Sequence, residues 1–221
     1  ISGYPKIYLK YLIKHREYYI EIYKDIFKKI CESTSLKIEE LVFIDYGTGN
    51  GLLAMFASML NFNKVIAIDV DEDFIAASKQ TAEATGFKQI IFINGSEDAL
   101  CQIDANGRSM VLAGTDVIEH IYNLDFFLSN LNKADKILLA LFTTASNPLN
   151  PRIVRRLKKQ QISDELYGGT SSDRSLFGND HISFLSSRES IIRKNFPEIG
   201  ADEVKILAQV SRGLRKDDII E

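Results

Sequence analysis

F-I-D-Y-G-T-G-N-G-L-L-A, residues 43–54, is the stretch that decides the fold. An apolar run ends in Asp45, passes through the alternate glycines Gly47, Gly49 and Gly51, and enters an apolar helical pattern. Glycine adopts backbone angles that are closed to other residues and lets a ligand approach the main chain. The stretch therefore predicts a strand, a tight turn and the start of a helix.

The spacing of the glycines separates this turn from the common phosphate-binding loops. A dinucleotide-binding turn has the pattern G-x-G-x-x-G, and a P-loop ends in G-K-[ST]. Here the turn is G-x-G-x-G, and no lysine follows it. Neither phosphate-binding pattern fits.

The stretch resembles the first motif of the class I S-adenosylmethionine (SAM) dependent methyltransferases, D/E-x-G-x-G-x-G. Asp45, Gly47, Gly49 and Gly51 fill its four defining positions. The resemblance implies S-adenosyl-L-methionine as cofactor and S-adenosyl-L-homocysteine as product. SAM carries a sulfonium and an ammonium group, so a carboxylate at the turn is more useful than a lysine. Asp45 and the turn, with Thr48, are expected to hold the amino-acid moiety.

Composition is that of an ordinary globular protein of 221 residues, with 45% hydrophobic and 26% charged residues. A net charge of −3 makes a nucleic acid an unlikely partner. Cys31 and Cys101 lack metal-ligand spacing and are expected to be reduced thiols, and no run is apolar enough for a membrane span. We expect a cytoplasmic protein, although a chain that begins at Ile1 leaves a lost leader open.

Alternating strand and helix patterns predict a doubly wound α/β fold, a mostly parallel sheet of about seven strands with helices on both faces. The chain is expected to form one methyltransferase domain, 1–221. Its parts are an N-terminal helical cap (1–35), a SAM-binding core (41–145), a lid or substrate segment after strand five (146–185) and a C-terminal helix and strand (186–221). Residues 201–210 are expected to form that strand, and a seventh strand is left open.

Asp69 ends the second predicted strand, 22 residues after Gly47. An acid at this place in a doubly wound fold accepts hydrogen bonds from the ribose hydroxyls of a bound nucleoside. The alternative is that Asp69 caps the next helix, but Asp71 is better placed to do so. Val70, beside Asp69, is included in the predicted cofactor site.

The loop after the third strand reads N-G-S-E-D-A-L. In the resembled family this loop commonly carries an aspartate for the adenine amino group, and here Ser96 stands in its place. The resemblance therefore implies Ser96 and Glu97, with Asp98 behind them, as candidate adenine contacts. The alternative is that these residues only cap a short helix.

The fourth strand runs into D-V-I-E-H-I, residues 116–121. This is similar to a signature of a methyltransferase subgroup that includes ubiquinone-type and small-molecule O-methyltransferases. It implies that Thr115 and Asp116 border the methionine part of SAM, and that Glu119 and His120 face the acceptor. His120 is a candidate catalytic residue. The equally weighted alternative is that Glu119 and His120 orient the following loop.

His181 is the second candidate catalytic residue. It lies in H-I-S-F-L-S-S-R-E-S-I, residues 181–191, which is similar to a pattern found between strands five and six of small-molecule methyltransferases. A histidine of near-neutral pKa suits a general base for a hydroxyl acceptor. The alternative, of equal weight, is that His181 caps a helix or holds the lid.

Two further patterns leave alternatives open. The tyrosines of the N-terminal helix either line a substrate pocket or, as we favour, pack on the sheet. The basic helix R-I-V-R-R-L-K-K, residues 152–159, either presents a solvated face, as we favour, or binds an anionic acceptor or an RNA backbone.

Together these patterns predict transfer of the SAM methyl group to a small-molecule acceptor, most readily to a hydroxyl oxygen, and an anionic acceptor is left open. Methyl transfer is an in-line displacement that requires mainly alignment. The alternatives are a metal-assisted RNA methyltransferase and a SAM-binding partner subunit without turnover. No metal site is predicted, because the histidine cluster of the RNA-modifying group is missing. The sequence does not predict the oligomeric state.

Overall fold

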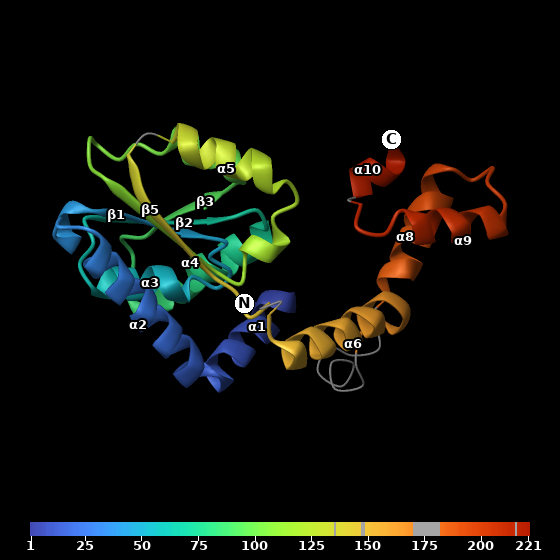
Figure 1. Ribbon diagram of the computed structural model, residues 1–221, viewed down its shortest axis with the longest axis horizontal. Helices are drawn as coiled ribbons and strands as arrows, with labels where there is room; N and C mark the ends of the chain where they lie inside the picture. Colours follow the sequence, from blue (N-terminus) through green and yellow to red (C-terminus); the bar gives the residue numbers. More distant parts are fainter. Residues whose placement is uncertain (135, 147–148, 170–181, 215) are drawn as a thin grey trace. The chain divides into compact units, whose positions relative to one another are not determined.

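The computed structural model describes residues 1–134, 136–146, 149–169, 182–214 and 216–221 (Figure 1). The chain divides into two compact units, Ile1–Ala145 and Ser146–Glu221. The predicted cofactor residues all belong to the first unit. The expectation of a single domain over 1–221 stays a prediction.

The first unit is built on a parallel five-stranded sheet with the order β3-β2-β1-β4-β5. All five strands lie where the sequence predicts them, within two residues at each end. The strands are β1 Val42–Tyr46, β2 Lys64–Asp69, β3 Ile91–Asn94, β4 Met110–Thr115 and β5 Ile137–Thr143.

Helices cover both faces of this sheet, with α5 on one face and α2, α3 and α4 on the other (Figure 1). Strand β1 shows why: Phe43 belongs to the core on the side of α2 and α3, whereas Val42 and Ile44 belong to the core on the side of α5. A strand buried on both faces is apolar along most of its length, and here the first three positions, Val42, Phe43 and Ile44, are apolar and buried. The helices are α1 Gly3–Lys14, α2 Arg16–Ser33, α3 Leu52–Met59, α4 Glu72–Thr85 and α5 Leu124–Lys133, and short 3₁₀ turns are η1 Ile38–Glu40, η2 Glu97–Gln102 and η3 Ile118–His120.

The strand order positions the candidate site. From β1 the chain moves to β2 and β3 on one side, and then returns to β4 and β5 on the other side. In open α/β sheets, ligands bind at the carboxyl ends of the strands where the order reverses. Here this point lies between β1 and β4, so the glycine turn after β1 and Thr115 at the end of β4 meet there.

The second unit is helical in its described residues: α6 Pro151–Tyr167, α8 Phe184–Asn195, α9 Ala201–Val210 and α10 Lys216–Ile220. Ile192, Val204 and Ala208 form its small core. The buried Arg188 fastens three of these helices, because its Nε donates to Ala208 O at 2.7 Å and its guanidinium pairs with Glu165 of α6.

Two predictions about the C-terminal part are wrong. Residues 201–210 form α9 and not a strand, and the described residues form five strands rather than about seven. The local sequence explains the helix. Gly200 precedes it, the Glu203 carboxylate accepts a hydrogen bond from Gly200 N at 3.3 Å, and Val204 and Ala208 are spaced by one helical turn.

The expected lid, residues 146–185, is described only in part. The predicted short basic helix is α6, which is 17 residues long, begins at Pro151 after the cap Asn150 and ends at Tyr167 before the C-cap Gly168. Residues 170–181 lie outside the described part of the chain, so the lid stays a prediction. In the part of the chain that the structure describes, no helix has the length and apolar character to cross a membrane.

We predict that Phe127→Ala destabilises the protein by about 3–5 kcal/mol, because the side chain is fully buried and its ring packs against Tyr46 and Phe142. The matched control is the preceding residue, Phe126, which is 43% exposed on the same helix. Phe126→Ala should cost less than about 1 kcal/mol. Urea unfolding of both variants measures this difference, and equal losses would contradict the assigned faces of α5.

Candidate functional site

The glycine turn between β1 and α3 uses its own amide groups inside the protein. The N–H groups of Gly47 and Thr48 both donate to Ile68 O at 2.9 Å, and Gly49 N donates to Asp69 Oδ2 at 2.8 Å. These bonds tie the turn to the end of β2. An anion cradle needs N–H groups that point at the ligand, and these three N–H groups are already paired.

The groups that the turn leaves for a ligand are acceptors. Gly51 N also donates within the turn, to Thr48 O at 2.9 Å. The carbonyl oxygens of Gly47 and Gly49 accept no hydrogen bond from the residues that the structure describes. Such a turn suits a ligand that brings donors and positive charge, such as an ammonium group, better than one that brings a phosphate.

Two of the glycines are required by close packing. Gly47 has φ 71°, and a Cβ there would lie 2.3 Å from Val117 Cγ2. Gly51 has φ 80°, and a Cβ there would lie 3.0 Å from Ser78 Cβ on α4. The absence of side chains lets Val117 and α4 approach the turn. Gly47 and Gly51 thus shape the site through packing, whatever their contact with a ligand.

Asp45, at the end of β1, is 1% exposed. Its Oδ2 accepts hydrogen bonds from Thr48 Oγ1 at 2.6 Å and from Ala54 N at 3.0 Å. Burial raises the pKa of Asp45 to about 7, although both hydrogen bonds oppose the shift. The carboxyl group therefore holds the strand, the turn and the start of α3 together. Its predicted contact with the amino-acid moiety of SAM stays a prediction.

Asp69, at the end of β2, is fixed by backbone amides on both sides. Its Oδ2 accepts from Gly49 N, and its Oδ1 accepts from Asp71 N at 3.0 Å. Asp71 caps α4, because its own Oδ1 accepts from Asp73 N at 2.8 Å, so the capping alternative for Asp69 is removed. A carboxylate offers about four acceptor positions, which leaves capacity for two hydroxyl groups. Burial raises the pKa of Asp69.

The residues predicted to contact adenine follow β3, and Val70, which was predicted only as part of the cofactor site, follows β2. Val70 is 68% exposed beside Asp69, and the Asn94 side chain donates to the carbonyls of Asp69 and Val70 at 3.1 and 3.0 Å. Ser96 is half-buried before η2, and its side chain makes no capping bond. Glu97 is half-buried next to it. The chain thus offers an apolar side chain and polar groups at adjacent strand ends.

Asp116, just after β4, has the unusual backbone angle φ 52°. Its N–H donates to Thr143 O at 2.8 Å, and its Oδ1 accepts from Ala145 N at 2.7 Å. Burial raises the pKa of Asp116. The carboxylate is therefore held in place between the ends of β4 and β5, next to the half-buried Thr115.

His120 and Glu119 lie on the exposed turn η3, and Glu119 accepts a hydrogen bond from the Thr144 hydroxyl at 2.5 Å. This bond joins the loop after β4 to the loop after β5. His181 lies outside the described residues. Their predicted catalytic roles stay predictions. The described ranges contain no group of three His, Cys, Asp or Glu side chains arranged for a metal ion.

The N-terminal tyrosines pack on the core and also border the site. Tyr19 and Tyr23 are buried, whereas a ring carbon of Tyr8 lies 3.5 Å from where a Gly49 Cβ would be. Burial, with the negative charge of Asp116 as a smaller cause, raises the pKa of Tyr8 to about 12. The sequence names Tyr8 only among the tyrosines that either line a substrate pocket or pack on the sheet, and it is not in the predicted cofactor site. The sequence shows the helical spacing of Tyr4, Tyr8 and Tyr11, but it does not show which of these tyrosines contacts the glycine turn.

Two contacts hold α1 at the turn. The Asn50 side-chain amide donates to Pro5 O at 3.0 Å. The rings of Tyr4 and Tyr8 each meet Phe74 edge to face, at centroid distances of 5.8 and 5.7 Å. The first helix thus covers the glycine turn and the start of α4, which the aromatic spacing alone did not establish.

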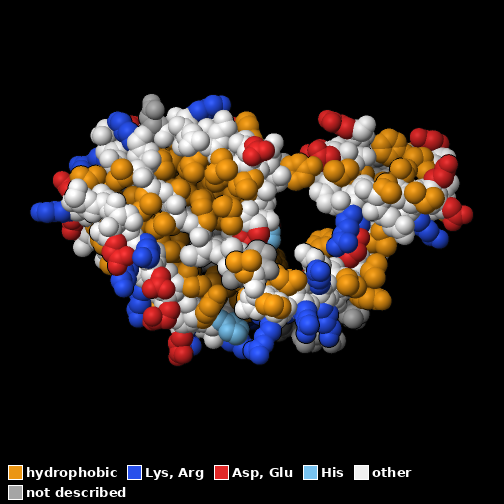
Figure 2. Space-filling model, in the orientation of Figure 1, with side chains coloured by type: hydrophobic (Ala, Val, Ile, Leu, Met, Phe, Trp, Pro, Cys, Tyr) orange, Lys and Arg blue, Asp and Glu red, His pale blue; other side chains and the backbone are white. Residues whose placement is uncertain are grey.

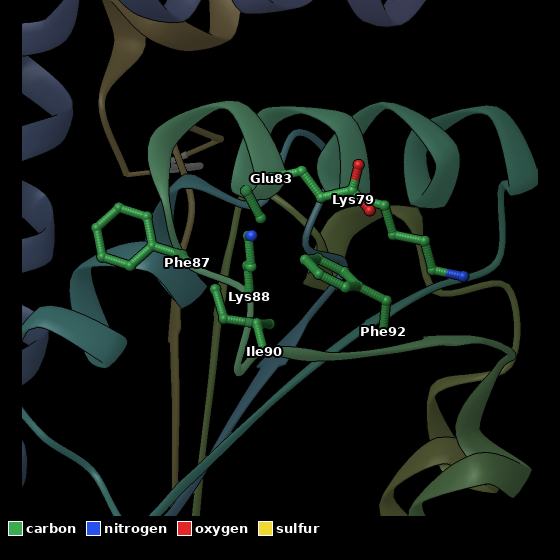
Figure 3. Close-up of a pocket in the computed structure, with 7 residues that line it drawn as sticks. Lys79, Glu83, Phe87, Lys88, Ile90 and Phe92 are labelled. Atoms are coloured by element: carbon green, nitrogen blue, oxygen red, sulfur yellow. The ribbon is translucent and has the colours of Figure 1, made fainter.

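A separate hollow of about 510 Å³ lies between α4 and the edge strand β3 (Figure 3). Lys79 and Glu83 descend into it from α4, while Ile90 and Phe92 line it from the sheet side. None of the predicted cofactor residues lines this hollow. It is therefore not the site formed by the glycine turn.

Known proteins are similar to part of this chain, and one family model covers the glycine turn. The family model for "Ribosomal protein L11 methyltransferase (PrmA)" matches residues 29–121. A ribosomal protein L11 methyltransferase from Acinetobacter baylyi is 34% identical over 128 residues, which are 58% of this chain and 38% of that protein. A ubiquinone biosynthesis O-methyltransferase from Rickettsia conorii is 32% identical over 102 residues, 46% of this chain and 34% of that one.

A solved structure from Galdieria sulphuraria, provisionally assigned as a sarcosine dimethylglycine methyltransferase, aligns with 93% of this chain and 81% of its own. Its TM-score is 0.50 at 14% identity, which bears on the fold alone. The chain has the fold of the class I SAM-dependent methyltransferases. Its matched core is that of a SAM-dependent methyltransferase, and SAM is the cofactor of that class, as the sequence predicts. The D-V-I-E-H-I subgroup stays a prediction.

The predicted acceptor is wrong. Small-molecule O-methylation followed from the resemblance of residues 116–121 and 181–191 to small-molecule enzymes. The family model and the Acinetobacter baylyi relative are instead named for methylation of a ribosomal protein. Short motifs at strand ends are shared among methyltransferases whose acceptors differ, so they fix the cofactor better than the acceptor. The chain spans 38% of the length of that relative.

Asp45 gives a pH prediction. Its pKa rises from an ordinary value of 3.8 to about 7 on folding, so the folded protein binds a proton that the unfolded chain releases. Stability should therefore fall as pH rises from 4 to 7, on the order of 4 kcal/mol from this group. Asp45→Asn stays neutral and can accept both bonds, so its stability relative to the wild type should grow over that window. Urea unfolding at pH 4.5 and 7.5 tests this, and a pH-independent difference would contradict it.

Proposed function

We propose that the protein transfers the methyl group of SAM to a group on a protein acceptor. The observation that carries the proposal is the glycine turn: the N–H groups of Gly47, Thr48, Gly49 and Gly51 are paired inside the protein, while the carboxyl groups of Asp45 and Asp69 lie against the turn. This arrangement favours a cationic ligand over a pyrophosphate. The matched relatives named for ribosomal protein L11 support a protein acceptor and make that protein the first candidate.

In this proposal the residues after β1, β2 and β4 each contact a different part of SAM. The Gly47 and Gly49 carbonyls accept from its ammonium group, Asp69 accepts from the ribose hydroxyls, and Asp116 borders the methionine part. Val70 offers apolar surface for the adenine ring, and Ser96 and Glu97 offer its polar partners. The backbone bonds that fix Asp69 support this division, because a fixed carboxylate aligns the nucleoside without further ordering.

The acceptor in this proposal enters beside Tyr8. The cofactor supplies a methyl carbon activated by a sulfonium. Asp116 and Glu119 give the surroundings negative charge, and the tyrosine rings give them π faces, a combination that attracts an amino group. A carboxylate near such a group holds the ammonium and takes one proton from it, which frees the nitrogen lone pair. The nitrogen then attacks the methyl carbon as the carbon–sulfur bond breaks, and the bond's electron pair leaves with the sulfur of S-adenosyl-L-homocysteine.

The substrate test uses SAM labelled with tritium in its methyl group. We expect label in ribosomal protein L11, separated from small molecules and RNA on a denaturing gel. Parallel reactions with a ribosomal RNA fraction and with a small-metabolite extract serve as controls. Label that appears only in RNA or in the small-molecule fraction, or in no acceptor while SAM still binds, would contradict a protein acceptor.

The cofactor prediction concerns Asp69. Asp69→Ala should weaken SAM binding by at least tenfold in calorimetry, because it removes the acceptors of the ribose hydroxyls. Asp73→Ala is the matched control, since Asp73 is an exposed acid one turn further on and loses the same charge. SAM should bind this control within about twofold of the wild type. Equal affinity of Asp69→Ala and the wild type would remove the ribose assignment.

A further inference from the structure

The helix α6 carries a surface that the methyltransferase site does not use. Its residues 152–159 hold five cations, all exposed, and the helix has no acidic residue before Asp164. Figure 2 shows Lys and Arg side chains gathered where Figure 1 draws this helix. The five cations, here called the basic stripe, are Arg152, Arg155, Arg156, Lys158 and Lys159.

Four of the five cations of the basic stripe lie on one side of the helix, and Lys158 lies apart from them. At 3.6 residues per turn, Arg152, Arg155, Arg156 and Lys159 fall within an arc of about 100°. The other side faces α8, since Glu165 pairs with the buried Arg188. Ile153, Val154 and Leu157 are half-buried, whereas the four cations are exposed. The packing of the second unit thus leaves the four cations facing solvent.

The positions of these cations lower the stability of helix α6 when no anion is bound. The amino end of a helix carries partial positive charge, and the first turn of α6 contains no acid to offset it. Cations three and four residues apart also repel one another. Among the described residues no carboxylate forms an ion pair with any of the five cations. The charges therefore oppose helix stability, and an external anion would offset the cost.

The details of the stripe match a nucleic-acid strand. Three of the five cations are arginines, whose planar forks bind phosphate oxygens in pairs. Arg152 with Arg156, and Arg155 with Lys159, form two rows with a rise of about 6 Å. Tyr167 lies near the edge of the same face and is 61% exposed, so its ring is available to stack on a base. An acidic protein segment would also pair with the cations, but it has no base to stack on the exposed Tyr167 ring.

We propose that this face of α6 binds single-stranded RNA through its phosphate backbone. The proposal goes beyond the proposed function, because it concerns a separate surface and requires no methyl transfer. It also revises the expectation that a nucleic acid is an unlikely partner. That expectation used the net charge of −3, which averages over the chain and hides the segregation of five cations on one helix.

The test measures binding of a fluorescent single-stranded RNA by anisotropy over a range of salt concentrations. In the variant Arg152→Gln/Arg155→Gln/Arg156→Gln/Lys159→Gln, affinity at 0.1 M salt should fall by at least about tenfold. The slope of log affinity against log salt should fall in magnitude by about 3, at 0.7 for each lost phosphate contact. Glutamine keeps the helix propensity, and circular dichroism checks that α6 persists.

The matched control, Lys28→Gln/Lys29→Gln/Lys79→Gln/Lys88→Gln, removes the same charge from exposed positions of the first unit. It should keep wild-type affinity within about twofold. The proposal is overturned if the α6 variant binds like the wild type, if the control loses as much, or if a polyglutamate peptide of equal charge competes as well as RNA. SAM is left out, so failure here does not count against methyl transfer, and failed methyl transfer does not count against RNA binding.

Discussion

The hydrogen bond from Gly49 N to Asp69 is the contact on which the candidate site depends. It joins the turn after β1 to the end of β2, and so fixes the two strand ends that border the cofactor site. It also pairs the Gly49 N–H, which would otherwise be able to donate to a phosphate. A single acid thereby fixes the turn geometry and leaves the Gly49 N–H without a place for an anion. The same carboxylate retains acceptor capacity for hydroxyl groups, which is what a nucleoside without a phosphate requires.

Asp45 shows how the strand end becomes rigid enough for that role. The carboxyl group is taken out of water, and two donors on the turn and α3 only partly compensate, as its raised pKa indicates. A group held in this way opposes global stability at neutral pH while it fixes the local geometry. Strained or costly groups of this kind are common at functional sites. The sequence placed Asp45 correctly, but the burial that determines its contacts depends on neighbouring strands β2 and β4.

The sequence predicts the features that depend on residues close together in the chain, and it misses features that depend on contacts between distant residues. The five strands, α4 and its cap Asp71 came from local patterns, namely apolar runs and capping residues. The helix 201–210 was missed because its apolar positions were given the wrong period, even though the Gly200 and Glu203 cap was present. Tyr8 was not assigned to the cofactor site for another reason. Its place beside Gly49 is set by the angle between α1 and the sheet, which the Asn50 side chain holds.

Local sequence patterns do not determine the methyl acceptor. Every class I methyltransferase must present the same methyl group, so the strand ends that hold SAM converge on similar residues, and the acceptor is selected by segments outside them. In the first unit of this chain, α1 lies outside the strand ends and brings Tyr8 to the glycine turn. The acidic and aromatic character around Asp116 and Tyr8 opposes an anionic acceptor, whereas five of the 27 Lys and Arg residues follow one another closely on α6. The two proposals therefore assign the acceptor group and the polyanion to different units of the chain, and each rests on the local charge of its own surface rather than on the net charge.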